Sequence, residues 1–305
     1  MKEACRASAY GGPGFIKRKQ EPIVINRSEF GKLVSVIIFI PGKEIHQISQ
    51  PSQVQHLSVI NYKVLQNEIK EIKKFFIKNK IQVLEMNSIK KFTSPPNLIF
   101  ARDLFWNGPK GIILSRMGSM IRASEEKYIL KCIIDNNQHL HHVVGSPSTF
   151  EGADLLWLTS KELLLGLNNR TNKSALNELQ QLLPDIKIHA IPLPKNIQHL
   201  LGLIQIIAPQ KALIRSQIAP KVLLQILEAR KFKLIDIPEI DEVTKLQGMN
   251  IVTISPNQII MPNDCPELQT IYQDNKIKVI KTFKVSELRK AAGGIACATG
   301  ILKRA

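Results

Sequence analysis

The stretch Leu155-Leu-Trp-Leu-Thr-Ser-Lys-Glu-Leu-Leu-Leu-Gly166 consists of two apolar runs separated by a short polar turn. Apolar runs of this length on either side of turn residues are typical of a β-hairpin. A second pair of runs stands at residues 251–254 and 258–261, on either side of Ser255-Pro-Asn257. The sequence therefore predicts two hairpins of the same design in different parts of the chain.

Strand and helix patterns alternate around these hairpins. Further strands are predicted at residues 34–41, 81–85, 112–115 and 212–214, and amphipathic helices at 62–80 and near 124–132. The order strand, strand, helix, strand recurs roughly every 50 to 60 residues, although sequence similarity between the repeats is faint. No long polar linker divides the chain, so a single domain of repeated α/β modules is predicted.

Composition excludes several classes of protein. The chain has 305 residues and is 44% hydrophobic, which is typical of a globular protein and not of a disordered or fibrous one. Its four cysteines are scattered without a CxxC pair, which argues against a disulfide framework or a zinc site and favours a reducing compartment. Without a long apolar run or a signal-peptide pattern, we expect a cytoplasmic protein with no membrane partner.

The net charge of +17 raises the question of a nucleic acid partner. The lysines alternate with apolar residues, as in residues 70–80, which is typical of the polar face of a helix. Aromatic residues make up only 6%, so surfaces on which bases could stack are scarce. The pattern favours a solvated surface over a nucleic acid site, and an anionic substrate or a lysine-rich composition remains an alternative.

Two segments place carboxylates in or beside apolar stretches. Arg102 and Asp103 lie within the otherwise apolar residues 95–106, and burying such a pair is costly unless it forms a salt bridge or binds a ligand. Glu151 and Asp154 flank a Gly-Ala turn and could cap the turn, bind a metal or hold a cationic group. The residues alone leave these alternatives open.

Three further residues are candidates for binding or catalysis. Arg170 lies in a polar loop and could bind a carboxylate, or simply be exposed. His199 precedes an apolar run, where a hydrogen-bonded core histidine is the alternative, and Cys297 lies in the small, glycine-rich residues 292–299, where its thiol is uncovered. The histidines at 139–142 have no carboxylate or cysteine at ligand spacing, so no metal and no cofactor are expected.

Taken in order, these segments resemble those of the guanidine-modifying enzyme superfamily, which comprises arginine deiminases, dimethylarginine dimethylaminohydrolases and amidinotransferases. The resemblance is carried by Phe100-Ala-Arg-Asp103, Phe150-Glu-Gly-Ala-Asp154, Asn169-Arg-Thr-Asn172, Gln198-His-Leu200 and Gly293-Gly-Ile-Ala-Cys297. It runs from about residue 30 to the end and is closest to the arginine-hydrolysing branch. It implies a fivefold pseudosymmetric α/β propeller (pentein-type) of repeated ββαβ modules in residues 27–305, with residues 1–26 as an N-terminal arm or lid.

The resemblance also implies a reaction. A guanidinium stays charged and planar, so its carbon becomes open to attack when carboxylates grip its nitrogens beside a nucleophile. In this scheme Cys297 forms a covalent thiouronium adduct, and His199 protonates the departing amine and then activates water. Asp103 and Glu151 would grip the guanidinium, with Asp154 as a further substrate-binding residue.

Substrate and outcome follow from the same resemblance. Free L-arginine or a methylated arginine is the expected substrate, with Arg170 holding the α-carboxylate and Arg122 as a second candidate for this role. Gly293 and Gly294 are expected to bring the sulfur close to the planar carbon. Two departures stand out, because Leu201 occupies a position where some deiminases have an aspartate and Ala153 replaces a commoner glycine. An amidinotransferase and a catalytically inactive basic binding protein remain alternatives, and the oligomeric state is open.

Overall fold

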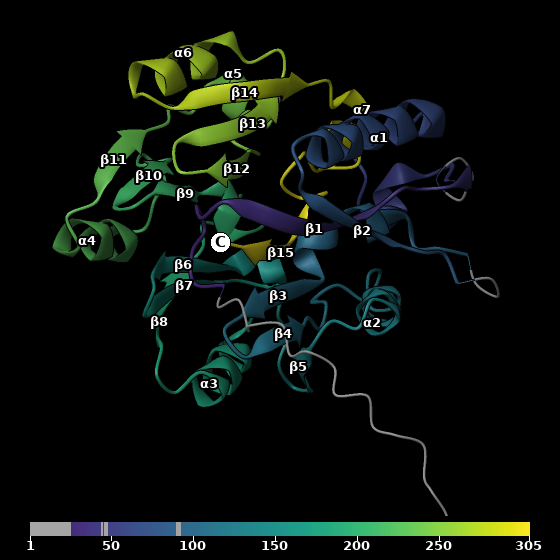
Figure 1. Ribbon diagram of the computed structural model, residues 1–305, viewed down its shortest axis with the longest axis horizontal. Helices are drawn as coiled ribbons and strands as arrows, with labels where there is room; N and C mark the ends of the chain where they lie inside the picture. The colour runs from purple at the N-terminus through teal and green to yellow at the C-terminus, as the bar shows by residue number, and fades with distance from the viewer. Residues whose placement is uncertain (1–25, 44, 46–47, 90–92) are drawn as a thin grey trace, which may run out of the picture.

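Five three-stranded sheets are arranged around a central axis in the computed structural model, with the helices on the outside (Figure 1). The structure describes residues 26–43, 45, 48–89 and 93–305. The predicted N-terminal arm therefore lies outside the described residues, except for Asn26. The arrangement confirms the predicted α/β propeller of ββαβ modules.

Four of the modules are formed by consecutive segments. Their innermost strands are β3 (Phe105–Gly108), β6 (Leu155–Thr159), β9 (Ile204–Ala208) and β12 (Val252–Ser255). Each pairs antiparallel with the next strand: β4 (Gly111–Leu114), β7 (Glu162–Leu167), β10 (Lys211–Ile214) and β13 (Gln258–Pro262). The outer strands are parallel to these: β5 (Leu140–Val143), β8 (Lys187–Pro192), β11 (Lys233–Asp236) and β14 (Lys278–Phe283).

A helix connects the second and third strands of each module, as parallel pairing requires a crossover. These helices are α2 (Glu126–Asp135), α3 (Lys173–Leu182), α4 (Lys221–Ala229) and α6 (Pro266–Asp274). Two shorter helices, α5 (Asp241–Thr244) and α7 (Ser286–Lys290), lie in the connections around β12 and β14. None of the helices in the described part of the chain is both long and apolar enough to cross a membrane.

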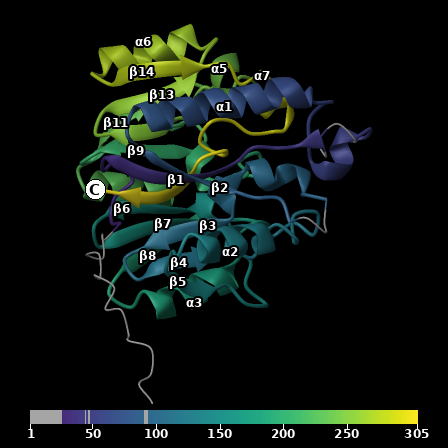
Figure 2. The ribbon, with the colours of Figure 1, turned by 45° about the vertical axis from the view of Figure 1, so that its right-hand side comes forward.

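The fifth module joins the two ends of the described chain. Its central strand β1 (Leu33–Phe39) pairs antiparallel with β15 (Gly300–Arg304) and parallel with β2 (Gln82–Met86), and α1 (Tyr62–Lys78) crosses between β1 and β2. Figure 2 shows β15 beside β1 near the axis. Because β15 takes the innermost position of this module, the loop before β15 is equivalent to the loops before β3, β6, β9 and β12.

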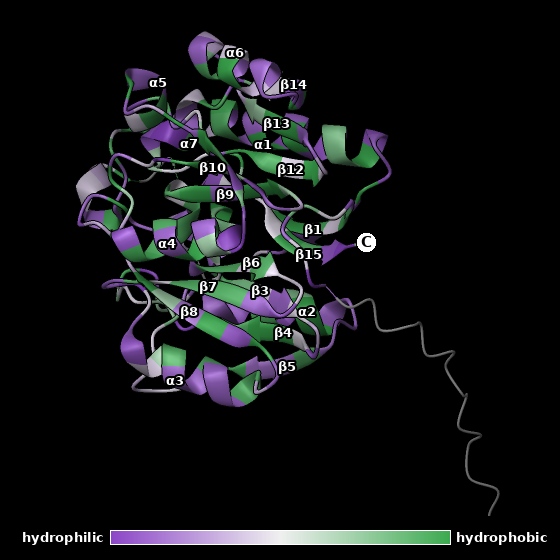
Figure 3. Ribbon diagram, turned by 90° about the vertical axis from the view of Figure 1, so that its left-hand side faces the viewer, coloured by the Kyte–Doolittle hydropathy of each residue, from purple (hydrophilic) through white to green (hydrophobic). Residues whose placement is uncertain are grey.

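The apolar pattern explains why these elements form. In α1, Leu65, Ile69, Ile72 and Phe76 are buried, and their spacing of three and four residues places them on one face. The helix begins at Asn61, whose side chain accepts a hydrogen bond from the backbone N–H of Val64. Figure 3 shows the inner strands as mostly hydrophobic, whereas the outer helices carry hydrophilic turns.

The repeat is somewhat shorter than predicted. The innermost strands β3, β6, β9, β12 and β15 begin at residues 105, 155, 204, 252 and 300, at intervals of 50, 49, 48 and 48 residues. The outer strand β2 was predicted at residues 81–85, whereas β5, β8, β11 and β14 were not, because polar and apolar residues mix in them, as in the half-exposed β8. The short inner strands β3, β9 and β15 were also missed, since each follows a turn that interrupts the apolar pattern.

Candidate active site

One residue just before the innermost strand of each module lies near the axis. These residues are Asp103, Glu151, His199, Asn250 and Cys297, at intervals of 48, 48, 51 and 47 residues. Equivalent positions in modules arranged around one axis face one another, which explains how residues so far apart in sequence meet. The backbone N–H of Arg102 donates to the carbonyl of Cys297 at 3.1 Å, which ties the first of these loops to the last.

A cavity of about 360 Å³ opens at this end of the axis. Its size is within the usual range for small-molecule sites. Five of the seven predicted site residues are among those that line it: Asp103, Arg122, Arg170, His199 and Cys297. Asn250 also lines it, whereas Glu151 and Asp154 are fully buried behind its wall.

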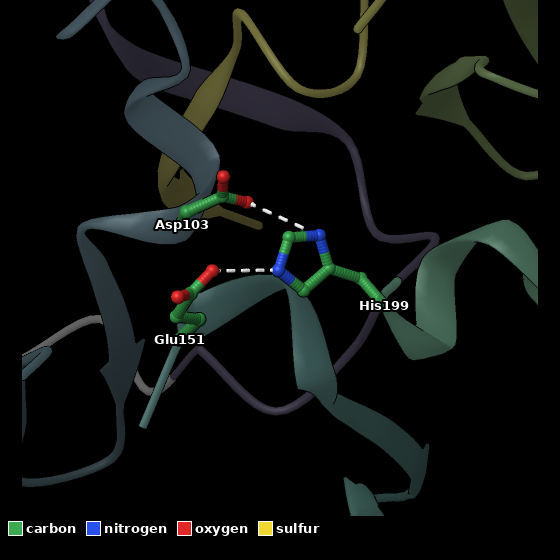
Figure 4. A group of neighbouring side chains, drawn as sticks. All are labelled: Asp103, Glu151 and His199. Carbon is green, nitrogen blue, oxygen red and sulfur yellow. Dashed lines mark hydrogen bonds and ion pairs between the residues drawn. The ribbon is translucent and has the colours of Figure 1, made fainter. Parts of the chain in front are cut away.

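His199 forms an ion pair with Glu151 (Figure 4). Its Nε2 lies 2.7 Å from Oε2 of Glu151, and its Nδ1 lies 3.8 Å from Oδ1 of Asp103. Burial by itself lowers the pKa of His199, but the carboxylates of Asp103, Asp154 and Glu151 outweigh it and raise that pKa above the usual value. Burial favours the neutral form of Glu151, yet His199, Arg122 and Arg170 hold its pKa below the usual range. The pair is therefore charged at neutral pH.

Both carboxylate oxygens of Glu151 already accept hydrogen bonds. Its Oε1 accepts from the backbone N–H of Gly118 at 3.2 Å and from Nη1 of Arg170 at 3.3 Å, and its Oε2 faces His199. A grip on a guanidinium by Glu151 stays a prediction, because a ligand would have to share these oxygens. The contacts of Glu151 make it the group that orients and charges His199.

Asp154 also accepts hydrogen bonds at both of its oxygens. Its Oδ2 accepts from Oγ1 of Thr171 at 2.6 Å and its Oδ1 from the backbone N–H of Leu200 at 3.0 Å. Burial raises its pKa to about 7. Both oxygens are therefore occupied behind the cavity wall, and substrate binding by Asp154 stays a prediction. Asp154 joins the Thr171 loop to the turn that carries His199.

Arg122 is committed to carboxylates of the protein. Its Nε and Nη2 donate to Glu125, and its Nη1 donates to Oδ2 of Asp103 at 2.6 Å, while the residue is only 2% exposed. A substrate carboxylate would have to displace these contacts, and Arg122 as a second carboxylate-binding residue stays a prediction. Its position beside Asp103 fixes the orientation of that carboxylate.

Asp103 keeps one oxygen free of hydrogen bonds. Oδ2 is held by Arg122, whereas Oδ1 has no hydrogen-bond partner among the described residues, although Asp103 is only 2% exposed. A buried carboxylate oxygen without a donor is unfavourable. Since Asp103 lines the same cavity as Cys297, a cationic donor bound there would satisfy it.

Asp103, Glu151 and His199 are also the one group of three potential metal ligands found in the described part of the chain, with atoms within 4.8 Å of one another. The Nη1 atom of Arg122 lies 2.6 Å from Asp103 and 3.8 Å from Glu151. This guanidinium already supplies a positive charge to both carboxylates. The donor set therefore fits a network of protein ion pairs better than a resident cation.

Arg170 lies at the wall of the cavity and is 9% exposed. Its Nη1 donates to Glu151 and its Nη2 donates to Oε1 of Gln55 at 3.2 Å. Gln55 belongs to the segment between β1 and α1 and also donates to Ser119 at 3.1 Å. The guanidinium thus stands where the rim of the cavity meets the buried carboxylates.

Cys297 is partly buried and contacts an asparagine that the sequence did not single out. Nδ2 of Asn250 lies 3.0 Å from Sγ of Cys297. Burial raises the pKa of the thiol, and Asp103 raises it further, whereas Asn250, the Gly294 backbone and Arg122 act in the opposite direction. The interval of about 48 residues between the other loop residues was the signal that could have identified Asn250.

The glycines before Cys297 have a different role from the one expected. A Cβ atom on Gly293 would lie 2.2 Å from Cε1 of Phe100, and one on Gly294 would lie 2.7 Å from Oδ1 of Asn250. Neither glycine has the positive φ that excludes other residues. The two glycines make room for Phe100 and Asn250. The prediction was instead that they bring the sulfur of Cys297 close to the substrate carbon.

Comparison with known proteins agrees with this geometry. Residues 39–203 and 206–304 match the model of a protein family described as arginine deiminase. The chain belongs to the arginine deiminase family. This membership confirms the resemblance to the guanidine-modifying superfamily.

Two sequence relatives of this family member are described as uncharacterized proteins. Uncharacterized protein YkgA of Bacillus subtilis (strain 168) is 26% identical over 204 residues, which are 67% of this chain and 69% of YkgA. An uncharacterized protein of Aeropyrum pernix is 20% identical over 219 residues, or 71% of this chain and 76% of that protein.

Solved structures share the fold of this family member at low sequence identity. Dimethylarginine dimethylaminohydrolase of Pseudomonas aeruginosa, a cysteine-to-serine variant with citrulline, has a TM-score of 0.71 at 17% identity, covering 88% of this chain and 99% of that one. The N-terminal domain of the cyanobacterial arginine dihydrolase ArgZ with product has a TM-score of 0.75 at 17% identity (90% and 98%). The amidinotransferase SxtG of Microseira wollei has a TM-score of 0.70 at 17% identity (92% and 97%).

Proposed function

We propose that the protein is a hydrolase that acts on the guanidino group of L-arginine or a methylated arginine through a covalent adduct on Cys297. The observation that carries this proposal is Oδ1 of Asp103, a buried acceptor that receives no hydrogen bond from the described residues and lies in the cavity that also contains Cys297 and His199. Membership of the arginine deiminase family supports the same substrate class.

In this proposal Asp103 binds the guanidinium of the substrate. A guanidinium carries N–H donors in one plane and keeps its charge at any physiological pH, so it satisfies a carboxylate oxygen that has no donor. Arg122 holds the other oxygen of Asp103 and prevents the carboxylate from turning away. Arg170, which lies at the rim with donors of its own, is proposed to hold the α-carboxylate of the substrate.

The reaction begins when Cys297, as thiolate, attacks the guanidinium carbon and forms a C–S bond. His199 carries a proton because of its pairing with Glu151, and it gives this proton to the departing nitrogen as the C–N bond breaks. Ammonia or a methylamine leaves, and a thiouronium remains on the sulfur. The neutral His199 then takes one proton from water, and the resulting hydroxide attacks the carbon. The C–S bond breaks and the hydroxyl proton passes to solvent or to the released amine, which gives citrulline and the thiolate.

Product analysis tests this proposal. Purified protein would be incubated with arginine, with methylarginines, and with arginine plus glycine, and the products would be identified by mass. Citrulline is the expected product. Guanidinoacetate from arginine plus glycine would replace the proposal by an amidinotransferase, ornithine would indicate a different cleavage, and the absence of any product from folded protein would favour a binding protein.

The covalent step has its own test with a matched control. Cys297→Ser should abolish turnover, and mass spectrometry of the wild-type protein quenched during turnover should show the adduct on the peptide that contains Cys297. Cys265→Ala serves as the control, because Cys265 is buried outside the cavity. Full turnover by Cys297→Ser would show that the covalent mechanism is wrong.

A further inference from the structure

The oxygen and the nitrogen of the Asn250 side-chain amide both interact with the loop of Cys297. Its Oδ1 accepts from the backbone N–H groups of Ala296 at 2.7 Å and Cys297 at 3.4 Å, and its Nδ2 lies 3.0 Å from Sγ of Cys297. Because backbone N–H groups are donors, the amide oxygen must face them. The amide N–H therefore points at the sulfur.

The loop that carries the cysteine is built around this amide. A Cβ atom on Gly294 would lie 2.7 Å from both Cγ and Oδ1 of Asn250, closer than real Cβ contacts allow. Any other residue at position 294 would displace the amide or the loop. Asn250 is itself held at its backbone, where its N–H donates to the carbonyl of Gln247 at 2.8 Å.

We infer that Asn250 is the residue that positions Cys297 and stabilises its thiolate by donating an N–H to the sulfur. Among the described residues, it is the one side chain whose donor lies within hydrogen-bond distance of Sγ. The inference deepens the proposed function, because it assigns a role to a further residue of the same site.

Other charged groups around the cavity act on the same thiol. Asp103 disfavours the thiolate, whereas Arg122 favours it, and the His199–Glu151 pair comes from the modules of β9 and β6, which do not adjoin the module of Cys297. Arg122 is bonded to Asp103 and Glu125, so its charge is largely compensated. These ion pairs do not provide a direct N–H donor to the sulfur, and such a donor stabilises a thiolate.

The experiment measures the pKa of the Cys297 thiol without any substrate. The rate of alkylation by iodoacetamide would be followed from about pH 6 to pH 10 in the full chain, with peptide mass spectrometry separating Cys297 from the other cysteines. Asn250→Ala removes the whole amide. Asn250→Asp keeps an oxygen for Ala296 and Cys297 but replaces the donor by a negative charge.

Both variants should raise the pKa of the Cys297 thiol by about one to two units, equivalent to a roughly 10- to 100-fold smaller thiolate fraction at neutral pH. Gly294→Ala should shift it in the same direction, because its methyl group displaces the amide. Gln258→Ala, which removes an exposed amide at the start of β13, should change nothing. If Asn250→Ala does not fold, the Asp variant decides the outcome alone.

An unchanged thiol titration in the folded Asn250 variants would overturn the inference. Because alkylation needs no guanidino compound, this result is independent of whether the proposed reaction is correct. If the protein turns over arginine, Asn250→Ala should lower kcat with little change in KM, since the amide acts on the nucleophile and a purely structural defect would not shift the thiol pKa.

Discussion

The Glu151→Gln variant tests most directly how the site keeps His199 protonated. Glu151 is fully buried and its Oε2 lies 2.7 Å from Nε2 of His199, whereas Asp103 lies 3.8 Å away on the other side of the ring. Glutamine has nearly the same shape but no charge, so the variant removes the ion pairs of Glu151 with His199 and Arg170 while the side chain still fills the site. The pKa of His199 should therefore fall.

The size of this fall follows from the contact that is lost. A hydrogen bond to a charged group contributes roughly 1.5–3 kcal/mol. One pKa unit corresponds to about 1.4 kcal/mol, so the pKa of His199 should decrease by roughly one to two units. Asp103 and Asp154 continue to favour the charged form, which keeps the decrease from becoming larger.

The assay is an NMR titration of the histidine ring protons, with the His199 signal assigned from its absence in His199→Asn. Glu178→Gln provides a matched control, because it removes a carboxylate 2.6 Å from the surface residue His142 and should leave the His199 titration unchanged. The reasoning is refuted if His199 titrates at the same pH in wild type and Glu151→Gln.

The same pair makes stability depend on pH in two directions. The pKa of Glu151 is lowered in the folded state, so its contribution is present above about pH 4.5 and is lost as the pH falls through the folded pKa. The pKa of His199 is raised, so its contribution is complete below about pH 6.5 and is lost as the pH rises through the folded pKa. Urea denaturation should show both losses in wild type and smaller ones in Glu151→Gln.

Three further changes test the other parts of the site. Arg122→Ala leaves the buried Asp103 and Glu125 without their partner, so the free energy of unfolding should fall by about 3–5 kcal/mol in urea denaturation; a value within error of wild type would contradict the ion-pair network. Arg170→Ala should raise KM for arginine much more than it lowers kcat, and an unchanged KM would remove Arg170 from substrate binding. Gly293→Ala places a methyl group against Phe100 and should destabilise the fold by about 1–3 kcal/mol, which a thermal melt would detect; no change in Tm would show that the loop has room to spare.

The fold could largely be predicted from the sequence. The hairpin at residues 155–166 is β6 and β7, and the amphipathic pattern at 62–80 is α1, because apolar spacing and turn residues act locally. The closed ring could not be derived in this way. It depends on the pairing of β1 with β15, and nothing within either strand specifies so distant a partner.

The candidate site could likewise be predicted from the sequence only in part. Residue types in five short segments, together with their resemblance to known enzymes, selected Asp103, His199 and Cys297, which line one cavity. Asn250 was missed because an asparagine before an apolar strand has no local peculiarity. Its role follows from its contact with the sulfur of Cys297, which lies 47 residues further along the chain.

The sequence by itself determined the repeated modules, the chemical groups that each loop supplies and the family. Only the tertiary structure decided which of the charged groups face the cavity. Asp103 turns one oxygen toward it, whereas both oxygens of Asp154 and of Glu151 are occupied by donors from their own and from adjacent modules. The physical reason is that a buried charge takes its role from the donors around it, and here those donors come from distant segments that closure of the ring brings together.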